Sequence, residues 1–182
     1  GGKIAVIGKD RERIESDKCV QEALIHGGIA NDGGVDIAWL ASDMFTDRAR
    51  TRELLADYHA VLVPGGFGVR GIEGMLEAIR YARESGLPFF GICLGMQTAI
   101  IEFARTVMGL REGNSSEFAP ECRDPDISLL ASQQHLTYVG GEIRTGAYTC
   151  RLRPCDYHAE HDRLPPVAQA RPPWRYRPQQ HS

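Results

Sequence analysis

The stretch PFFGICLGMQTAI, Pro88–Ile100, is the part of this sequence on which the prediction of the fold depends. An apolar run ends at Cys93, and apolar residues at helical spacing begin directly after it. Gly91 and Gly95 stand on either side of the cysteine. The pattern therefore predicts a strand, a tight turn and a helix, with Cys93 at the corner between them.

Such a corner gives a cysteine the surroundings that a nucleophile needs. A residue at a sharp strand-to-helix turn is held with its side chain exposed, and flanking glycines let neighbouring backbone pass closely. The helix that follows directs its free N–H groups and partial positive charge toward the sulfur, which favours the thiolate. We therefore predict that Cys93 is a nucleophile. A buried structural cysteine is the alternative.

The first 110 residues alternate short apolar runs with helical patterns, which predicts the fold class. Strands and helices in alternation, with short connections, form parallel sheets that are covered on both faces. We expect an α/β fold with an open, mostly parallel sheet of the flavodoxin-like type and helices on both faces. The first helix is expected to stop at Gly27-Gly28. Strands are predicted at 3–8, 35–40, 60–63 and 89–92, and helices at 20–26, 47–58, 72–85 and 94–108.

A second glycine-rich turn, PGGFGVRG, covers Pro64–Gly71 and follows the third predicted strand. Consecutive glycines can present backbone N–H groups to an anion, so Gly66 and Leu94 are predicted to donate the two N–H groups of an oxyanion hole. The same turn has the G-x-G-x-x-G spacing of a dinucleotide-binding loop. Its place after the third strand, and the lack of an acidic residue for a ribose about 20 residues further on, argue against that interpretation. A plain tight turn is the other alternative.

The pattern weakens after Leu110. Arg111–Arg123 is predicted to be a polar loop, and short strands, expected to be antiparallel, are predicted at 129–130, 136–139 and 147–152. Apolar periodicity disappears from Pro154 onward, so we predict an incomplete domain over residues 1–153 and a divergent tail at 154–182 that is disordered or poorly packed.

The tail also holds residue types that bind zinc. Cys150, Cys155, His158 and His161 are close in sequence, but their spacing fits the common structural zinc sites poorly. We therefore predict no metal site.

Composition excludes several classes of protein. The 182 residues carry a net charge of −3 without a basic run before the tail, which argues against a nucleic-acid or anionic-membrane surface. No apolar segment approaches the roughly 20 residues of a membrane span. Five scattered cysteines indicate reduced thiols and a cytoplasmic protein. The chain opens with Gly1-Gly2-Lys3, so we expect it to be a piece of a longer protein.

Several separated motifs resemble one known family. LVPGGFGVRGIEG (62–74), GICLGMQTAIIEFAR (91–105) and NSSEFAPEC (114–122) are similar to the glutamine amidotransferase domain of CTP synthases. KIAVIGKD (3–10) and GGEIRTGAYTCRL (140–152) resemble the start and a later part of that domain. The resemblance covers about residues 3–153 and implies a class I glutamine amidotransferase fold whose C-terminal part is incomplete.

The resemblance implies a role for particular residues. Cys93 matches the nucleophile that attacks the side-chain amide of glutamine, forming a thioester and releasing ammonia. Gly66 matches a glycine of the oxyanion hole that also contacts glutamine, and Glu117 matches an acid that holds the amino-acid end of the substrate. The glutamine-binding segment after the nucleophile matches Leu94, Gly95, Met96 and Gln97.

The resemblance also implies partners. The substrate is L-glutamine, and its ammonia passes to a separate synthetase domain, where ATP activates UTP for amination to CTP. ATP and Mg²⁺ belong to that synthetase domain, so no cofactor is expected in this one. The full enzyme is expected to be a homo-oligomer.

The resemblance further implies an arginine for the carboxylate of glutamine and a histidine–glutamate pair, the base and the residue that orients it. We identify no such His-x-Glu pair after Arg153, because His158, His161 and His181 lie in surroundings that do not match the family. We therefore expect a truncated or frameshifted domain that is inactive alone. The alternative is a non-catalytic remnant of the same fold that binds glutamine or a partner.

Overall fold

The computed structural model describes residues 1–9, 18–66, 69–123 and 125–128, all within one compact unit, Gly1–Leu129. The strands are β1 (Gly2–Gly8), β2 (Val35–Ala41), β3 (Ala60–Val63), β4 (Phe89–Gly91), β5 (Asn114–Ser115) and β6 (Pro125–Ile127). The helices are α1 (Lys18–Ala30), the short 3₁₀ helix η2 (Ser42–Met44), α2 (Arg48–Leu55), α3 (Ile72–Ser85) and α4 (Leu94–Thr106).

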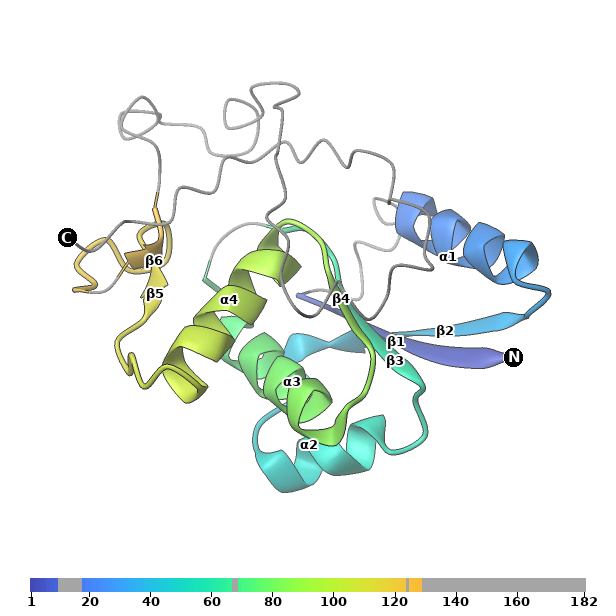
Figure 1. Cartoon of the computed structure of the whole chain (residues 1–182), viewed down its shortest axis with the longest axis horizontal. Helices are drawn as coiled ribbons and strands as arrows, with labels where there is room; N and C mark the ends of the chain where they lie inside the picture. The colour runs from blue at the N-terminus through green and yellow to red at the C-terminus, as the bar shows by residue number, and fades with distance from the viewer. Residues whose placement is uncertain (10–17, 67–68, 124, 129–182) are drawn as a thin grey trace, which may run out of the picture. The chain divides into compact units, whose positions relative to one another are not determined.

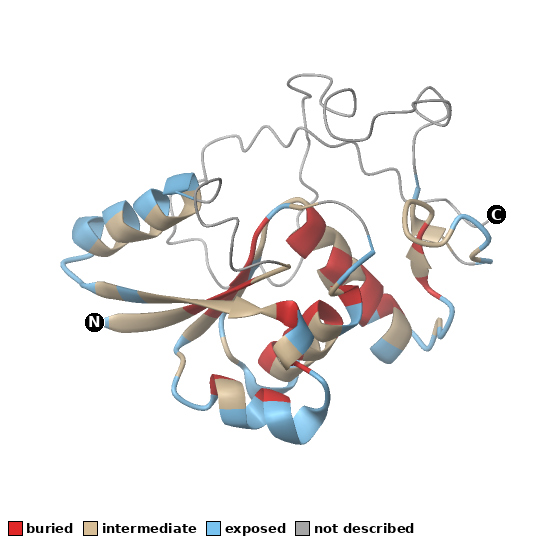
Figure 2. Ribbon diagram, turned by 180° about the vertical axis from the view of Figure 1, so that it is seen from behind, coloured by how far each residue is buried: buried red, intermediate tan, exposed pale blue. Residues whose placement is uncertain are grey.

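Four strands form a parallel sheet in the order β2-β1-β3-β4, which confirms the predicted fold class. The central strand β1 pairs with β2 and β3, so that Ile4 lies opposite Ile37 on one side and Ala60 on the other. Helix α1 lies on one side of the strands, whereas α2 and α3 lie on the opposite side, as Figures 1 and 2 show. Helix α4 packs against α3.

The core lies where the sheet meets α3 and α4. Ala5, Val6 and Ile7 are consecutive and all fully buried, as expected for a parallel strand that is covered on both faces. In α3 the predicted apolar stripe is buried, and its residues are Met75, Leu76, Ile79 and Ala82. Figure 2 shows the buried residues along the strands and on the inner sides of these helices.

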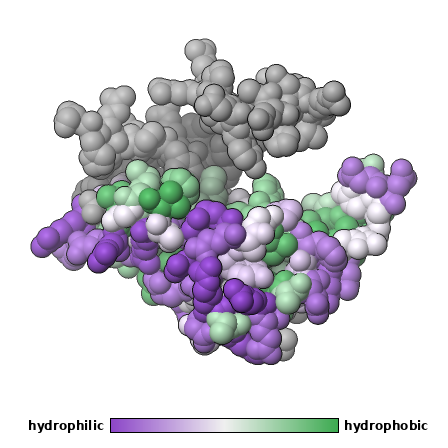
Figure 3. All heavy atoms as spheres, turned by 60° about the horizontal axis from the view of Figure 1, so that its bottom comes forward, coloured by the Kyte–Doolittle hydropathy of each residue, from purple (hydrophilic) through white to green (hydrophobic). Residues whose placement is uncertain are grey.

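The boundaries of α2 and α3 have local causes. Helix α2 begins after Asp47, whose carboxylate accepts the Arg50 N–H at 2.9 Å and satisfies a free donor of the first turn. This hydrogen bond, the largest of several contributions, holds the pKa of Asp47 below its usual value. Helix α3 lies between Gly71 and Gly86, which both have positive φ, and its bounds are those predicted. The exposed residues of α2 are mostly charged. The face seen in Figure 3 is largely hydrophilic, with apolar patches between the polar residues.

The prediction that the first helix stops at Gly27-Gly28 is wrong, because α1 continues to Ala30. One glycine in a helix costs only about 1 kcal/mol, which neighbouring contacts can offset. A Cβ on Gly28 would lie 2.6 Å from Val35 Cγ2, so this glycine allows α1 to approach β2. The turn after the helix is made by Asp32, with φ 52°, and by the Gly33 N–H, which donates to Gly28 O at 2.8 Å.

The segment after α4 is less regular. Arg111–Arg123 is not entirely loop as predicted, since β5 lies within it and pairs in parallel with β6. A strand of two residues has no periodicity that a sequence could reveal. The short strands predicted from residue 129 onward and the tail at 154–182 lie outside the described residues. No helix in the described part of the chain is long and apolar enough to cross a membrane.

Two glycine-to-alanine substitutions should change stability in opposite directions. A Cβ on Gly95 would lie 2.0 Å from Val63 O, so Gly95→Ala is expected to destabilise the fold by about 3 kcal/mol or more. Gly27 is exposed in α1, and a Cβ on it would meet nothing within 4 Å, so Gly27→Ala should stabilise by about 0.5–1 kcal/mol. Urea unfolding measures both, and a loss of stability in Gly27→Ala equal to that in Gly95→Ala would contradict this account.

Candidate functional site

Cys93 occupies a strained corner between β4 and α4. Its φ is 55° and its ψ is −106°, and it directly precedes the first residue of the helix. Among the described residues, Asp32 is the only other non-glycine residue with positive φ. Such a conformation costs on the order of 1–3 kcal/mol and persists only where the surroundings enforce it. The backbone thus has the strand-to-helix geometry that the sequence predicts.

Gly91 and Gly95 are the surroundings that enforce this corner. A Cβ on Gly91 would lie 2.5 Å from the carbonyl carbon of Gly95, and one on Gly95 would lie 2.0 Å from Val63 O. The Ile92 N–H donates to Val63 O at 2.9 Å, and the Gly95 N–H donates to Ile92 O at 2.9 Å. The first turn of α4 therefore lies directly on the backbone at the ends of β3 and β4. The G-x-C-x-G spacing follows from that contact.

The turn after β3 lies beside the cysteine. A Cβ on Gly65 would lie 3.5 Å from Cys93 Cβ and 3.8 Å from Cys93 Sγ, so Gly65 borders the thiol directly. A Cβ on Gly66 would lie 3.1 Å from Leu94 Cδ2, which places the two residues of the predicted oxyanion hole side by side. No role was predicted for Gly65 from the sequence. The signal that could have found it is the doubled glycine after Pro64.

The predicted glutamine-binding residues after Cys93 form the first turn of α4. Gly95 is buried, whereas Met96 and Gln97 are half-buried. The Gln97 N–H donates to Cys93 O at 3.0 Å, and the Thr98 hydroxyl lies within hydrogen-bonding distance of Leu94 O at 2.9 Å. These bonds hold the turn together, and the contact of its side chains with glutamine stays a prediction.

Glu117 follows β5, on a different segment from the corner. It is half-buried, and its backbone N–H donates to Ser115 Oγ at 3.2 Å. The next residue, Phe118, packs against the hydrophobic core. This local structure holds Glu117 on an anchored segment, while its pairing with a substrate stays a prediction.

The sequence after Arg153 contains a His-x-Glu spacing that was expected to be absent. The expectation that no His-x-Glu spacing occurs there is wrong, because His158-Ala159-Glu160 has it. These residues, and the zinc candidates Cys150 and Cys155, lie outside the described residues. Within the described ranges, no group of three or more His, Cys, Asp or Glu side chains could hold a metal ion.

Comparison with known proteins identifies the family. The sequence profile described as glutamine amidotransferase class-I matches residues 13–169. The chain belongs to this family. The matched range includes the corner at Cys93, the turn Pro64-Gly65-Gly66 (the PGG turn) and the His158-Ala159-Glu160 spacing.

Individual members of this family are closely similar to the chain. A protein named CTP synthase from Symbiobacterium thermophilum is 47% identical over 155 residues, which are 84% of this chain and 29% of the relative. The CTP synthase of Geobacter sulfurreducens is 49% identical over 150 residues, or 82% of this chain and 28% of the relative. The chain therefore spans less than a third of the length of these relatives.

A solved structure shares the fold. The glutaminase domain of Trypanosoma brucei CTPS with bound acivicin superimposes with a TM-score of 0.68 and 31% identity, covering 74% of this chain and 52% of that one. The fold and the family thus agree with the motifs on which the resemblance was based.

The contact between Gly65 and the sulfur predicts a selective effect of a methyl group. In Gly65→Ala the Cβ would sit at ordinary van der Waals distance from Cys93, so stability should change by about 0.5 kcal/mol or less. Because the methyl group shields the thiol, alkylation of Cys93 by iodoacetamide should slow severalfold. Gly34→Ala, which adds a Cβ with nothing within 4 Å, is the matched control. Equal slowing in both variants would mean that Gly65 does not border the reactive face of the sulfur.

Proposed function

We propose that this chain is the glutamine-hydrolysing part of a CTP synthase, with Cys93 as the nucleophile. The observation that carries the proposal is the enforced φ of 55° at Cys93, at the N-terminus of α4 and against the PGG turn. Family membership and the similarity to proteins named CTP synthase support the choice of substrate. The bound acivicin in the Trypanosoma brucei domain fits a glutamine site in this fold.

The proposed chemistry is a two-step hydrolysis. The Cys93 thiolate adds to the side-chain amide carbon of glutamine, and the carbonyl oxygen becomes an oxyanion that the Gly66 and Leu94 N–H groups stabilise. Protonation of the nitrogen lets ammonia leave, and a thioester remains on the sulfur. Water then adds to the thioester, giving glutamate and the free thiol. A group that gives and takes a proton near the sulfur accelerates both steps, and repeated turnover depends on it.

The remaining binding roles follow the same reasoning. Gly95, Met96 and Gln97 line the start of α4 and are proposed to cradle the substrate, and Glu117 is proposed to pair with its ammonium group. Neither step needs a cofactor or a metal. The ammonia serves a synthetase domain that uses ATP and Mg²⁺ to aminate UTP, in a homo-oligomeric enzyme of the cytoplasm.

Activity of the isolated chain depends on the base. We propose that this chain does not sustain glutamine turnover, because His158 and Glu160 have the right spacing but lie beyond Pro154, where the apolar periodicity of the domain is lost. In that case the chain binds glutamine or forms the thioester without completing the cycle. The alternative is a non-catalytic remnant of the same fold, which binds glutamine or a partner without hydrolysing it.

Thiol labelling tests the nucleophile. Cys19 is exposed, whereas Cys93 and Cys122 are partly buried. If exposure alone set the rate of alkylation, Cys19 would therefore react first. If α4 favours the thiolate of Cys93, iodoacetamide near pH 7 should modify it about tenfold faster than Cys19. Mass spectrometry of peptides after timed labelling gives the three rates. Equal rates at the three cysteines would remove the case for an activated thiol.

Ammonia release tests the base. The chain is expected to release no more than about one equivalent of ammonia from glutamine, and Cys93→Ser none, because the nucleophile is present and the base is not effective. Sustained release that both Cys93→Ser and His158→Ala abolish would show a working glutaminase whose base is His158. That result would overturn the proposed inactivity and leave the proposed reaction intact.

A further inference from the structure

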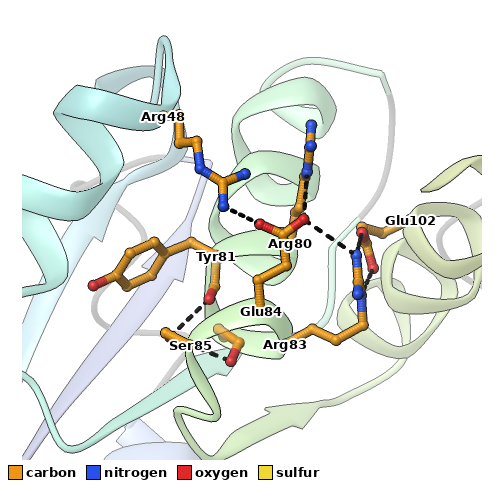
Figure 4. A network of polar contacts seen from close by, with 8 residues as sticks. Arg48, Arg80, Tyr81, Arg83, Glu84, Ser85 and Glu102 are labelled. Atoms are coloured by element: carbon orange, nitrogen blue, oxygen red, sulfur yellow. Dashed lines mark hydrogen bonds and ion pairs between the residues drawn. The ribbon is translucent and has the colours of Figure 1, made fainter. Parts of the chain in front are cut away.

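Helix α4, which begins directly after Cys93, is tied to α3 by an ion pair whose carboxylate is buried. Glu102 lies in α4 with a side chain that is only 3% exposed. Arg83 of α3 donates two hydrogen bonds to it from one edge of its guanidinium, from Nε to Oε2 at 2.9 Å and from Nη2 to Oε1 at 2.7 Å. Figure 4 shows the two parallel contacts. A pair of this kind fixes direction as well as distance, because the two planar groups must align.

The ion pair belongs to a network that spans three helices. Glu84 of α3 contacts Arg80 at 3.0 Å and Arg83 at 3.8 Å, and it also pairs with Arg48 of α2. The hydrogen bond to the Glu102 carboxylate raises the pKa of Arg83, so the guanidinium stays charged. Hydrogen bonds from Arg48 and Arg80 lower the pKa of Glu84 and keep it charged too. Arg83 is therefore held by Glu84 of its own helix and by Glu102 of α4.

Stability alone is a weak reason for burying this carboxylate. Removing a charge from water costs several kcal/mol, and well-packed apolar residues often stabilise a fold as much as a buried ion pair does. A role in fixing the orientation of α4 accounts better for an ion pair with two hydrogen bonds at this position.

The position of Glu102 links the pair to the thiol. Glu102 is nine residues after Cys93, or about 14 Å along a helix at 1.5 Å per residue. Helix α4 cannot slide freely at its other end, because Gly95 lies against Val63 without room for a Cβ. A helix moves nearly as a rigid body within a close-packed interior, so a rotation or shift at Glu102 is carried to the corner.

We propose that Arg83 and Glu102 are positioning residues for Cys93. The pair sets the rotation and depth of α4 against α3, and thereby aims the N–H groups of its first turn at the sulfur. The inference rests on the proposed role of Cys93 as the nucleophile. It concerns two residues that touch neither the thiol nor a substrate, and they would act only through the helix.

The test separates stability from positioning. Arg83→Met leaves the buried Glu102 carboxylate without its partner, so it should lower the urea midpoint. Glu102→Leu should lower it less, because the Arg83 side chain is 33% exposed and lies beside Glu84. The double variant Arg83→Met/Glu102→Leu replaces the pair by apolar side chains and should recover most of that stability. Its Cys93 alkylation by iodoacetamide should nevertheless stay about tenfold slower than in the original chain, because small misplacements cost that much or more. The pH at which labelling is half-maximal should rise.

Two further variants serve as controls. Arg80→Gln removes another ion pair with Glu84 and leaves Arg83 and Glu102 paired, so its labelling rate should equal that of the original chain. Arg83→Lys keeps the charge and loses the planar fork, so its rate should be intermediate. Arg83→Lys also allows the Cys93 labelling rate to be compared if the double variant does not fold.

The outcomes distinguish the two proposals. A double variant that recovers stability together with the original labelling rate and pH midpoint would show a purely structural pair and overturn the inference. Slowing in Arg80→Gln as large as that in Arg83→Lys would do the same. If Cys93 in the original chain reacts no faster than Cys19, the nucleophile itself fails, and the positioning role fails with it.

Discussion

The contact between the backbones of α4 and β3 is the constraint on which the rest of this structure depends. Gly95 lies so close to Val63 that no side chain fits between them, and Gly91 meets the backbone of Gly95 in the same way. The chain must therefore pass from β4 into α4 within two residues, and Cys93 is left with a φ of 55°. The strained position of the thiol is a consequence of close backbone packing, whatever side chain stands at that position.

The same packing brings separate parts of the chain to one edge of the sheet. In parallel sheets, ligands bind outside the carboxyl ends of the strands, and both glycine turns lie there because β3 and β4 are neighbours. Gly65 borders the sulfur, and the pair of Arg83 with the buried Glu102 holds the far part of the same helix. The site is thus supported at both ends of α4, by glycine contacts at the start and by charge near the end.

Sequence patterns predict the elements whose causes are local. Ala60–Val63 and Ile72–Ser85 have the predicted bounds, since a short apolar run and a helical stripe between glycines need no distant partner. The end predicted for α1 at Gly27-Gly28 was wrong, because Gly28 serves the approach to Val35, which only the folded chain provides. Strand β5, with two residues, is defined solely by its pairing with β6.

At the site, the order of residues is sufficient to predict the strand-to-helix corner, the candidate nucleophile Cys93 and the family, because G-x-C-x-G and PGG are contiguous patterns. Tertiary structure decides which glycine borders the sulfur and which carboxylate is buried. Gly65 and Cys93 are 28 positions apart and Arg83 and Glu102 are 19 apart. Contacts between such positions depend on how the strands and helices pack. The spacing of residues along the chain does not indicate which distant residues will touch.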